Sequence, residues 1–227
     1  MNKRAFVLAV DGPAASGKGT LSRHLAEHFD WAYLDTGGLY RAVARDALTN
    51  NSGNLDEASA AQAAHNLDFG TLQDPALRTA DIGEAASVVA AMPKVREALI
   101  GTQRKFAYNP PEDKTGAILD GRDIGTVICP DAPVKLFVTA SPEVRARRRH
   151  KDHLASASAL TEAEVLAELH IRDQRDASRD QSPLKPAQEA HLLDTTEMSI
   201  EAAVTAAILI IEKEMETWQS RQYHKDL

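Results

Sequence analysis

Short apolar runs alternate along the chain with segments in which apolar residues recur every three or four positions. The continuous runs predict five buried strands, at residues 5–10, 31–34, 117–119, 134–138 and 191–193. The helical spacing predicts helices at residues 17–29, 38–48, 142–153, 161–178 and 199–218. Strands that alternate with helices predict an α/β fold, in which a five-stranded parallel sheet has helices on both faces.

The middle of the chain interrupts this alternation. Residues 55–108 follow an Asn- and Gly-containing loop, are rich in alanine and have a helical pattern, so we expect them to form an insertion. The loop 109–116, with two prolines and three charges, closes that region and has no assignable role. A chain of 227 residues favours one core, and we expect a single domain over 1–227.

Composition excludes several classes of partner. A formal net charge of −7 argues against a broad nucleic-acid surface. The one cysteine, Cys129, cannot form an internal disulfide, which favours a reducing compartment, and the cytoplasm is the expected location. Apolar stretches are all shorter than the roughly 18 residues of a membrane span, so no membrane partner is expected. We expect a monomer that acts on small molecules.

A glycine-rich motif follows the first predicted strand and opens the first predicted helix. The motif G-x-x-x-x-G-K is carried by Gly12, Pro13, Ala14, Ala15, Ser16, Gly17 and Lys18, with Gly19 and Thr20 after it. Such a loop turns backbone N–H groups and a helix N-terminus toward a triphosphate, and the lysine adds a mobile cation. The sequence therefore predicts binding of ATP with Mg²⁺. The alternative is a strand-to-helix turn that merely requires glycine.

The residue after the lysine departs from the usual motif. Gly19 stands where a hydroxyl that holds Mg²⁺ is expected, and Thr20 carries the nearby hydroxyl instead. The metal ligands are therefore not predicted. The variant G-K-G-T is similar to that of nucleoside monophosphate kinases.

Two further segments make the resemblance specific. Residues 34–41 read LDTGGLYR and residues 120–126 read DGRDIGT, and together they closely resemble bacterial cytidylate kinases. This resemblance implies that the first segment surrounds the acceptor phosphate and the second holds the base. The implied acceptor-site residues are Thr36, Tyr40, Arg41, Arg122 and Asp123. Thr36 keeps the hydroxyl of the serine that is usual in the family.

The same resemblance extends into the insertion and into a predicted lid over about 143–180. It implies that Ser87 and Arg96 contact the pyrimidine and phosphate, although Arg96 beside Glu97 is by itself typical of a surface charge. Arg145, Arg148 and Arg149 match the family's lid, whereas Arg147 does not. In the lid-exit helix, Arg172, Arg175 and Arg179 share one stripe, and the resemblance implies that Asp176 holds the sugar hydroxyls. A solvated face with i,i+4 ion pairs is the alternative for this stripe.

The resemblance implies transfer of the γ-phosphoryl group of ATP to CMP, and to dCMP. An acceptor phosphate is already a nucleophile, so positioning and charge neutralisation are the expected mechanism. We expect Lys18, Arg145, Arg148 and Arg179 to act on the transferred group. The alternatives are a P-loop kinase for another small acceptor and a nucleotide-dependent ATPase switch.

Overall fold

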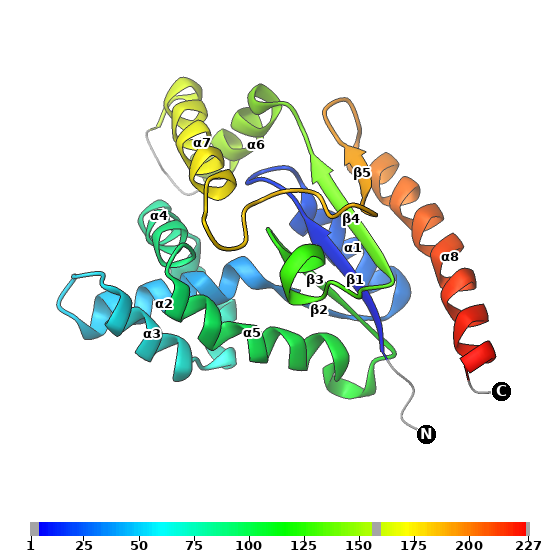
Figure 1. The fold of residues 1–227 in the computed structure, drawn as a ribbon. Helices are drawn as coiled ribbons and strands as arrows, with labels where there is room; N and C mark the ends of the chain where they lie inside the picture. The colour runs from blue at the N-terminus through cyan, green and yellow to red at the C-terminus, as the bar shows by residue number, and fades with distance from the viewer. Residues whose placement is uncertain (1–4, 156–159, 226–227) are drawn as a thin grey trace.

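A computed structural model describes residues 5–155 and 160–225, and its centre is one parallel sheet (Figure 1). The strands of the sheet are β1 (Phe6–Asp11), β2 (Ala32–Asp35), β3 (Gly116–Gly121), β4 (Val134–Thr139) and β5 (His191–Asp194). Their order across the sheet is β2-β3-β1-β4-β5, and all neighbouring pairs are parallel. The predicted α/β class and five-stranded parallel sheet are therefore confirmed.

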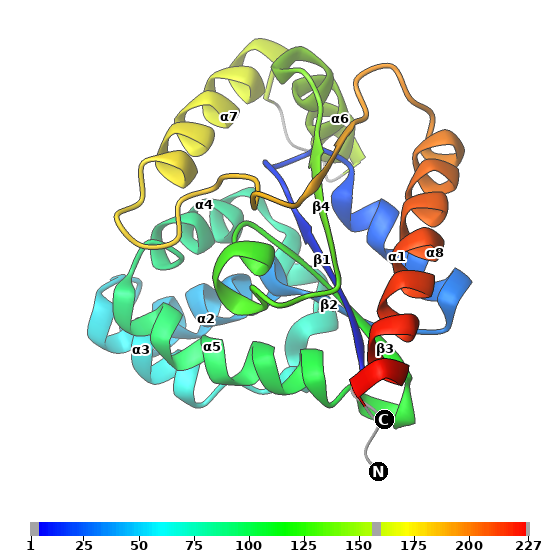
Figure 2. The ribbon, with the colours of Figure 1, turned by 45° about the vertical axis from the view of Figure 1, so that its right-hand side comes forward.

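Helices connect the strands and cover both faces of the sheet (Figures 1 and 2). The helices are α1 (Lys18–Phe29), α2 (Thr36–Asn50), α3 (Glu57–His65), α4 (Ala80–Val89), α5 (Pro93–Tyr108), α6 (Pro142–Ala155), α7 (Glu162–Ala177) and α8 (Ile200–Lys225). None of them, over the residues that the structure describes, is long and apolar enough to cross a membrane.

The two faces of the sheet bury separate hydrophobic clusters. On one face, Leu8 and Leu136 pack with side chains of α1 and α8, such as Leu25 and Ile211. On the other face, the strands pack against α2 and α5, and the cluster continues into α3 and α4. Because successive side chains of a strand point to opposite faces, the continuous apolar runs supply both clusters.

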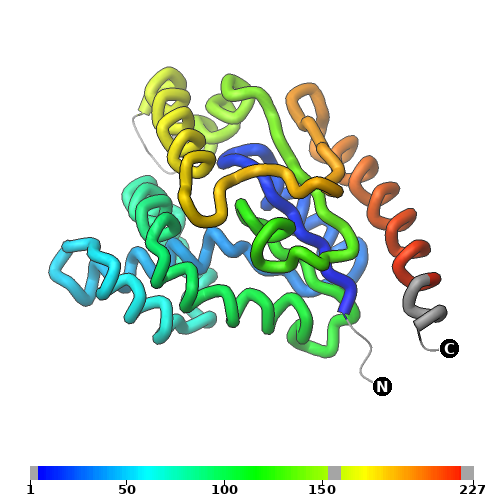
Figure 3. The backbone as a smooth tube through the Cα atoms, in the orientation of Figure 1, coloured from blue at the N-terminus to red at the C-terminus, as the bar shows by residue number. Residues whose placement is uncertain are grey.

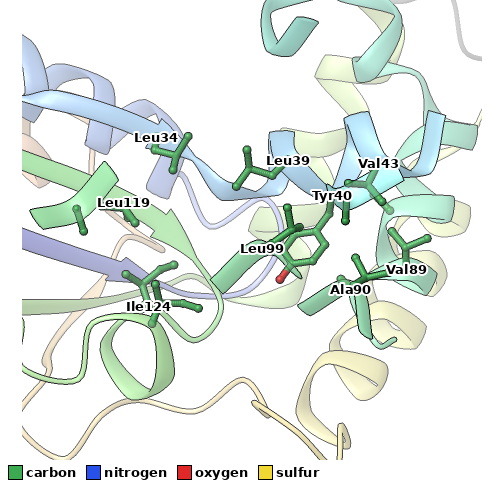
Figure 4. Packing of buried hydrophobic residues seen from close by; sticks show 14 of the residues in the cluster. Leu34, Leu39, Tyr40, Val43, Val89, Ala90, Leu99, Leu119 and Ile124 are labelled. Carbon is green, nitrogen blue, oxygen red and sulfur yellow. The ribbon is translucent and has the colours of Figure 1, made fainter. Parts of the chain in front are cut away.

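The second cluster extends from the sheet into the region predicted as an insertion. Leu34 and Leu119 lie at the strand side of the cluster, Leu99 of α5 lies beside Tyr40 of α2, and Val43 of α2 lies near Val89 of α4 (Figure 4). Residues 55–108 thus share one core with the sheet. α5 itself covers the sheet, packing against β3 and β1.

A third, smaller cluster lies above the end of β1 that leads into the glycine-rich loop. Ala146 of α6 and Val165 and Leu169 of α7 pack with Ala14 of that loop. The predicted N-terminal cap of α7 is present, because the Thr161 hydroxyl accepts the N–H of Glu164, whose carboxylate accepts the N–H of Thr161. Residues 156–159 of the predicted lid lie outside the described residues.

Three local features differ from the sequence-based expectation. α2 begins at Thr36 and not at residue 38, because the Asp35 carboxylate accepts the N–H of Gly38 and caps the helix. A π-helical turn (Ile124–Ile128) follows β3. α7 ends at Ala177, so Arg179 lies beyond the helix and not on its face. Figure 3 traces the segment that continues from there to β5.

Candidate active site

The glycine-rich loop joins β1 to α1 in the way that the sequence predicts. Gly12 has a φ of +154°, and a Cβ there would come within 2.0 Å of the carbonyl oxygen of Val138. Gly17 has a φ of +88° and directly precedes the helix, which begins at Lys18. The Lys18 ammonium donates to the carbonyl of Pro13 at 3.3 Å, so the lysine folds back over its own loop. The loop therefore has the form of a phosphate cradle at a helix N-terminus.

Two cavities meet at this loop. The first, here called the P-loop cavity, is lined by residues 15–21, by Arg148 and Arg149 and by the start of α8, and has a volume of about 580 Å³. The second, here called the arginine cavity, is lined by Arg41, Arg96, Arg122, Arg172 and Arg179 among others, and its volume is about 100 Å³. Among the described residues, Lys18 alone lines both cavities.

The arginine cavity has hydrogen-bond donors to spare. The Nε atoms of Arg41, Arg172 and Arg179 are buried and have no hydrogen-bond partner within the described part of the chain. Burial, followed by the positive charge of Arg122, lowers the pKa of Arg172 to about 10. Buried cations with unpaired donors are costly unless an anion joins them, so this cavity is suited to bind an anionic group.

Carboxylates at the ends of β2 and β3 face the lysine. Asp120 accepts the Tyr33 hydroxyl at 2.7 Å, and Asp35 pairs with Arg41 at 2.5 Å. Burial and the negative charge of Asp35 raise the pKa of Asp120 to about 6. Burial and the Arg122 cation lower the pKa of Lys18 to about 7. The charges of this region are therefore mutually dependent, and an added phosphate would change them together.

The Asp120 carboxylate also accounts for the unusual Gly19 after Lys18. A Cβ at Gly19 would lie 3.3 Å from Oδ2 of Asp120 and 3.7 Å from the Tyr33 hydroxyl. A side chain at position 19 would therefore press on the Asp120–Tyr33 hydrogen bond. Thr20, one residue later, lines the P-loop cavity.

The far end of the arginine cavity holds a buried ion pair. Arg96, only 3% exposed, pairs with Asp123 and donates to the carbonyl of Ala90 at 3.1 Å. Its guanidinium lies 5.9 Å from the centroid of the Tyr40 ring. The surface-charge interpretation of Arg96 is therefore wrong, because the Asp123 partner comes from a segment that folds back against α5.

Ser87 and Asp176 complete the walls of this cavity. The buried Ser87 hydroxyl accepts from Arg175 at 2.9 Å. Asp176 accepts from Arg122 at 2.8 Å and also pairs with Arg179. Within the predicted stripe, Arg175 alone has the solvated character of the alternative, because its partner Glu84 has a side chain 61% exposed. The buried Nε atoms of Arg172 and Arg179 argue against a solvated face for the other two arginines.

Of the remaining predicted residues, some line one of the two cavities and Arg145 lines neither. Thr36 lines the arginine cavity and donates to the carbonyl of Asp120 at 2.7 Å. Arg148 lines the P-loop cavity and donates to the carbonyl of Thr195 at 2.7 Å. Arg145 lines neither of these cavities: it is 4% exposed, and both terminal nitrogens donate to Asp173, at 3.2 and 2.6 Å.

Three charged residues that line the arginine cavity, Asp35, Asp120 and Arg172, were not among the predicted site residues. Arg172 appeared only as one member of the stripe, and its place in the cavity depends on how α7 packs against α6 and the glycine-rich loop. Asp35 and Asp120 end neighbouring strands, at the edge where parallel sheets bind ligands, and that position was a usable signal. No cluster of three metal-ligating side chains occurs among the described residues.

Comparison with known proteins agrees with the geometry. A sequence model of the cytidylate kinase family matches residues 8–213. A cytidylate kinase of Rhodopseudomonas palustris (strain BisB18) is 54% identical over 207 residues, which cover 91% of this chain and 96% of that protein. A cytidylate kinase of Brucella suis biovar 1 (strain 1330) is 56% identical over 207 residues, with 91% and 93% covered.

A solved structure supports the fold independently. The crystal structure of an uncharacterized protein from Eubacterium ventriosum ATCC 27560 has a TM-score of 0.53 at 14% identity, and the match covers 91% of this chain and 98% of that chain. At this identity the likeness concerns the fold alone. The family match and the relatives span the glycine-rich loop, both cavities and the arginines around them. The chain therefore belongs to the cytidylate kinase family.

Proposed function

We propose that this chain transfers the γ-phosphoryl group of ATP to CMP, and likewise to dCMP, which carries the same base and phosphate. The observation that carries the proposal is the position of Lys18, which lines both the P-loop cavity and the arginine cavity. A donor triphosphate in the first cavity and an acceptor phosphate in the second would meet at this ammonium group. At such a junction the phosphoryl group passes directly from donor to acceptor, and no covalent intermediate with the protein is needed.

The residues of the two cavities have different roles in phosphoryl transfer. Lys18 and the buried donors of Arg41, Arg172 and Arg179 neutralise the charge that spreads over the transferred group. The oxygen ligands present, on Asp35, Asp120 and Thr20, fit the hard cation Mg²⁺, which would neutralise donor phosphate charge when it is bound with ATP. Closure of the lid over the cavities would exclude water and so limit hydrolysis of ATP.

Asp123 is the residue that distinguishes the acceptor bases. Cytosine presents an amino donor at N4, which a carboxylate accepts, whereas uracil presents the acceptor O4 at that place. Asp123 is 5% exposed, so its mismatch with O4 is poorly compensated by water. We expect a preference for CMP over UMP of about ten- to a hundredfold from this contact.

The test is a coupled assay with ATP and each of the four nucleoside monophosphates. CMP should have the highest kcat/KM, and Asp123→Asn should reduce the CMP to UMP ratio, mainly by weakening the use of CMP. A kinase for another small acceptor would leave all four nucleotides poor substrates. An ATPase switch would hydrolyse ATP at the same rate with and without them, and either result would refute the proposal.

A further inference from the structure

One buried carboxylate ties the strand before the glycine-rich loop to the segment that carries Asp123. Asp11, the last residue of β1, is 4% exposed. Its Oδ1 accepts the N–H of Ile124 at 2.7 Å, and its Oδ2 accepts the N–H of Gly125 at 2.8 Å. Both oxygen atoms of the carboxylate therefore accept hydrogen bonds from a segment more than a hundred residues away in the chain.

The two N–H groups open the π-helical turn (Ile124–Ile128), whose N-cap residue is Asp123. An aspartate at an N-cap commonly accepts the N–H groups of its own helix. Here the Asp123 side chain makes no capping hydrogen bond within the described residues and instead pairs with Arg96. Asp11 supplies the cap from another strand, and this leaves the Asp123 carboxylate in the arginine cavity.

The π-helical turn packs closely against Asp11 and against Lys135 of β4. A Cβ at Gly125 would lie 3.3 Å from Oδ2 of Asp11 and 3.0 Å from Cδ of Lys135 on β4. Burial raises the pKa of Asp11 to about 7, while the two N–H groups oppose this shift. The nearby charges of Asp123 and Arg122 act on Asp11 in opposite directions. The carboxylate thus fits the turn by shape and by hydrogen bonding.

We propose that Asp11 is a positioning residue for acceptor selection: it caps the turn after Asp123 and so keeps the Asp123 carboxylate directed at Arg96 and the base. This inference rests on the proposed function of Asp123. Without the Asp11 carboxylate, the N–H groups of Ile124 and Gly125 need another acceptor. The nearest one in sequence is Asp123 itself, which would turn away from the cavity to cap its own helix.

The kinetic test is a double-mutant cycle between Asp11→Asn and Asp123→Asn. The asparagine has the shape of aspartate but offers one acceptor oxygen, and its amide would face an N–H group. Asp11→Asn should lower the CMP to UMP ratio of kcat/KM by about tenfold, mainly through KM for CMP, with KM for ATP unchanged within about twofold. In the Asp123→Asn background the same substitution should leave the ratio unchanged.

An equal effect of Asp11→Asn in both backgrounds, or an unchanged ratio in the first, overturns the inference. The matched control is Asp56→Asn, which alters a carboxylate cap at the start of α3, outside both cavities, and should leave the ratio as it is. If Asp11→Asn does not fold, Asp11→Ser retains one short acceptor and is compared in the same cycle.

A crystal structure of the folded Asp11 variant gives a readout that does not depend on the acceptor. We expect the Asp123 carboxylate to accept the N–H of Gly125 or Thr126 and to leave Arg96. An Asp123 that still pairs with Arg96 refutes the inference even if CMP is confirmed as substrate. Equal use of CMP and UMP by the unaltered protein instead refutes the proposed function of Asp123, while the carboxylate position still decides the role of Asp11.

Discussion

Lys18 carries its charge where folding disfavours it. Burial, and next the cation of Arg122, lower its pKa from 10.5 to about 7, although Asp120 and Asp35 act in the opposite direction. Because the pKa is lower in the folded than in the unfolded state, the cost of the charge is fully present below about pH 7. The cost is relieved as the pH rises from about 7 toward 10.5. Such an unfavourable position is typical of a group kept for binding an anion.

Replacement of this lysine separates its two effects. Lys18→Ala should lower kcat by about 10²- to 10³-fold, since a charged donor to the transferred group is lost. The free energy of unfolding at pH 7 should stay the same or increase, because an unfavourable buried charge is removed. Steady-state kinetics and urea denaturation at pH 7 and pH 10 measure both.

The pH dependence of the denaturation series also tests the direction of the pKa shift of Lys18. The stability advantage of the alanine variant should be largest at pH 7 and shrink by pH 10. A variant with the turnover of the unaltered protein, or one that unfolds at pH 7, would contradict the role given to Lys18.

Helices α6 and α7 are joined to the glycine-rich loop by one buried guanidinium. Arg145 of α6 forms a two-pronged pair with Asp173 of α7 and donates to the carbonyl of Ala14 at 3.3 Å. It also donates to the carbonyl of Ala140 at 3.1 Å. These contacts hold two elements of the predicted lid against the loop. Sequence similarity placed Arg145 among the arginines acting on the transferred group, and its role there stays a prediction.

Stability distinguishes the two roles of Arg145. Arg145→Ala should lower the free energy of unfolding by about 2–4 kcal/mol, somewhat less than for a fully buried pair because the Asp173 side chain is 27% exposed. Arg147→Ala, on the exposed face of the same helix, is the matched control and should change stability by less than about 0.5 kcal/mol. Unchanged stability with a collapsed kcat would instead support the catalytic role.

The elements that sequence patterns predicted well are those whose signal is local. The apolar run of β1, the glycine-rich turn and α1 are contiguous, so their order was readable. The π-helical turn after Asp123 was not, because its cap comes from Asp11 on another strand. The burial of Arg96 likewise depends on a partner 27 residues away. Local spacing cannot report contacts that the tertiary fold creates.

At the scale of the whole molecule, an anion bound in the arginine cavity should stabilise the fold. Its sheet and three hydrophobic clusters are packed, yet the arginine cavity retains buried guanidinium nitrogens without partners among the described residues. An anion that binds there supplies those partners in the folded state only. Binding should therefore stabilise the whole fold, and the phosphate of the acceptor should account for most of the effect.

Thermal unfolding with a series of ligands tests this expectation. CMP at about 100 times its Kd should stabilise the fold by about 2.7 kcal/mol, which for a chain of this size corresponds to a rise in Tm of about 5–11 °C. Cytidine, which has the base and sugar but no phosphate, should raise Tm by less than about 2 °C at the same concentration, because it leaves the arginine donors unpaired. Arg172→Ala, which removes one of these donors, should reduce the CMP effect without abolishing it. Equal shifts with CMP and cytidine would mean that the base, and not the arginine cavity, supplies the binding energy.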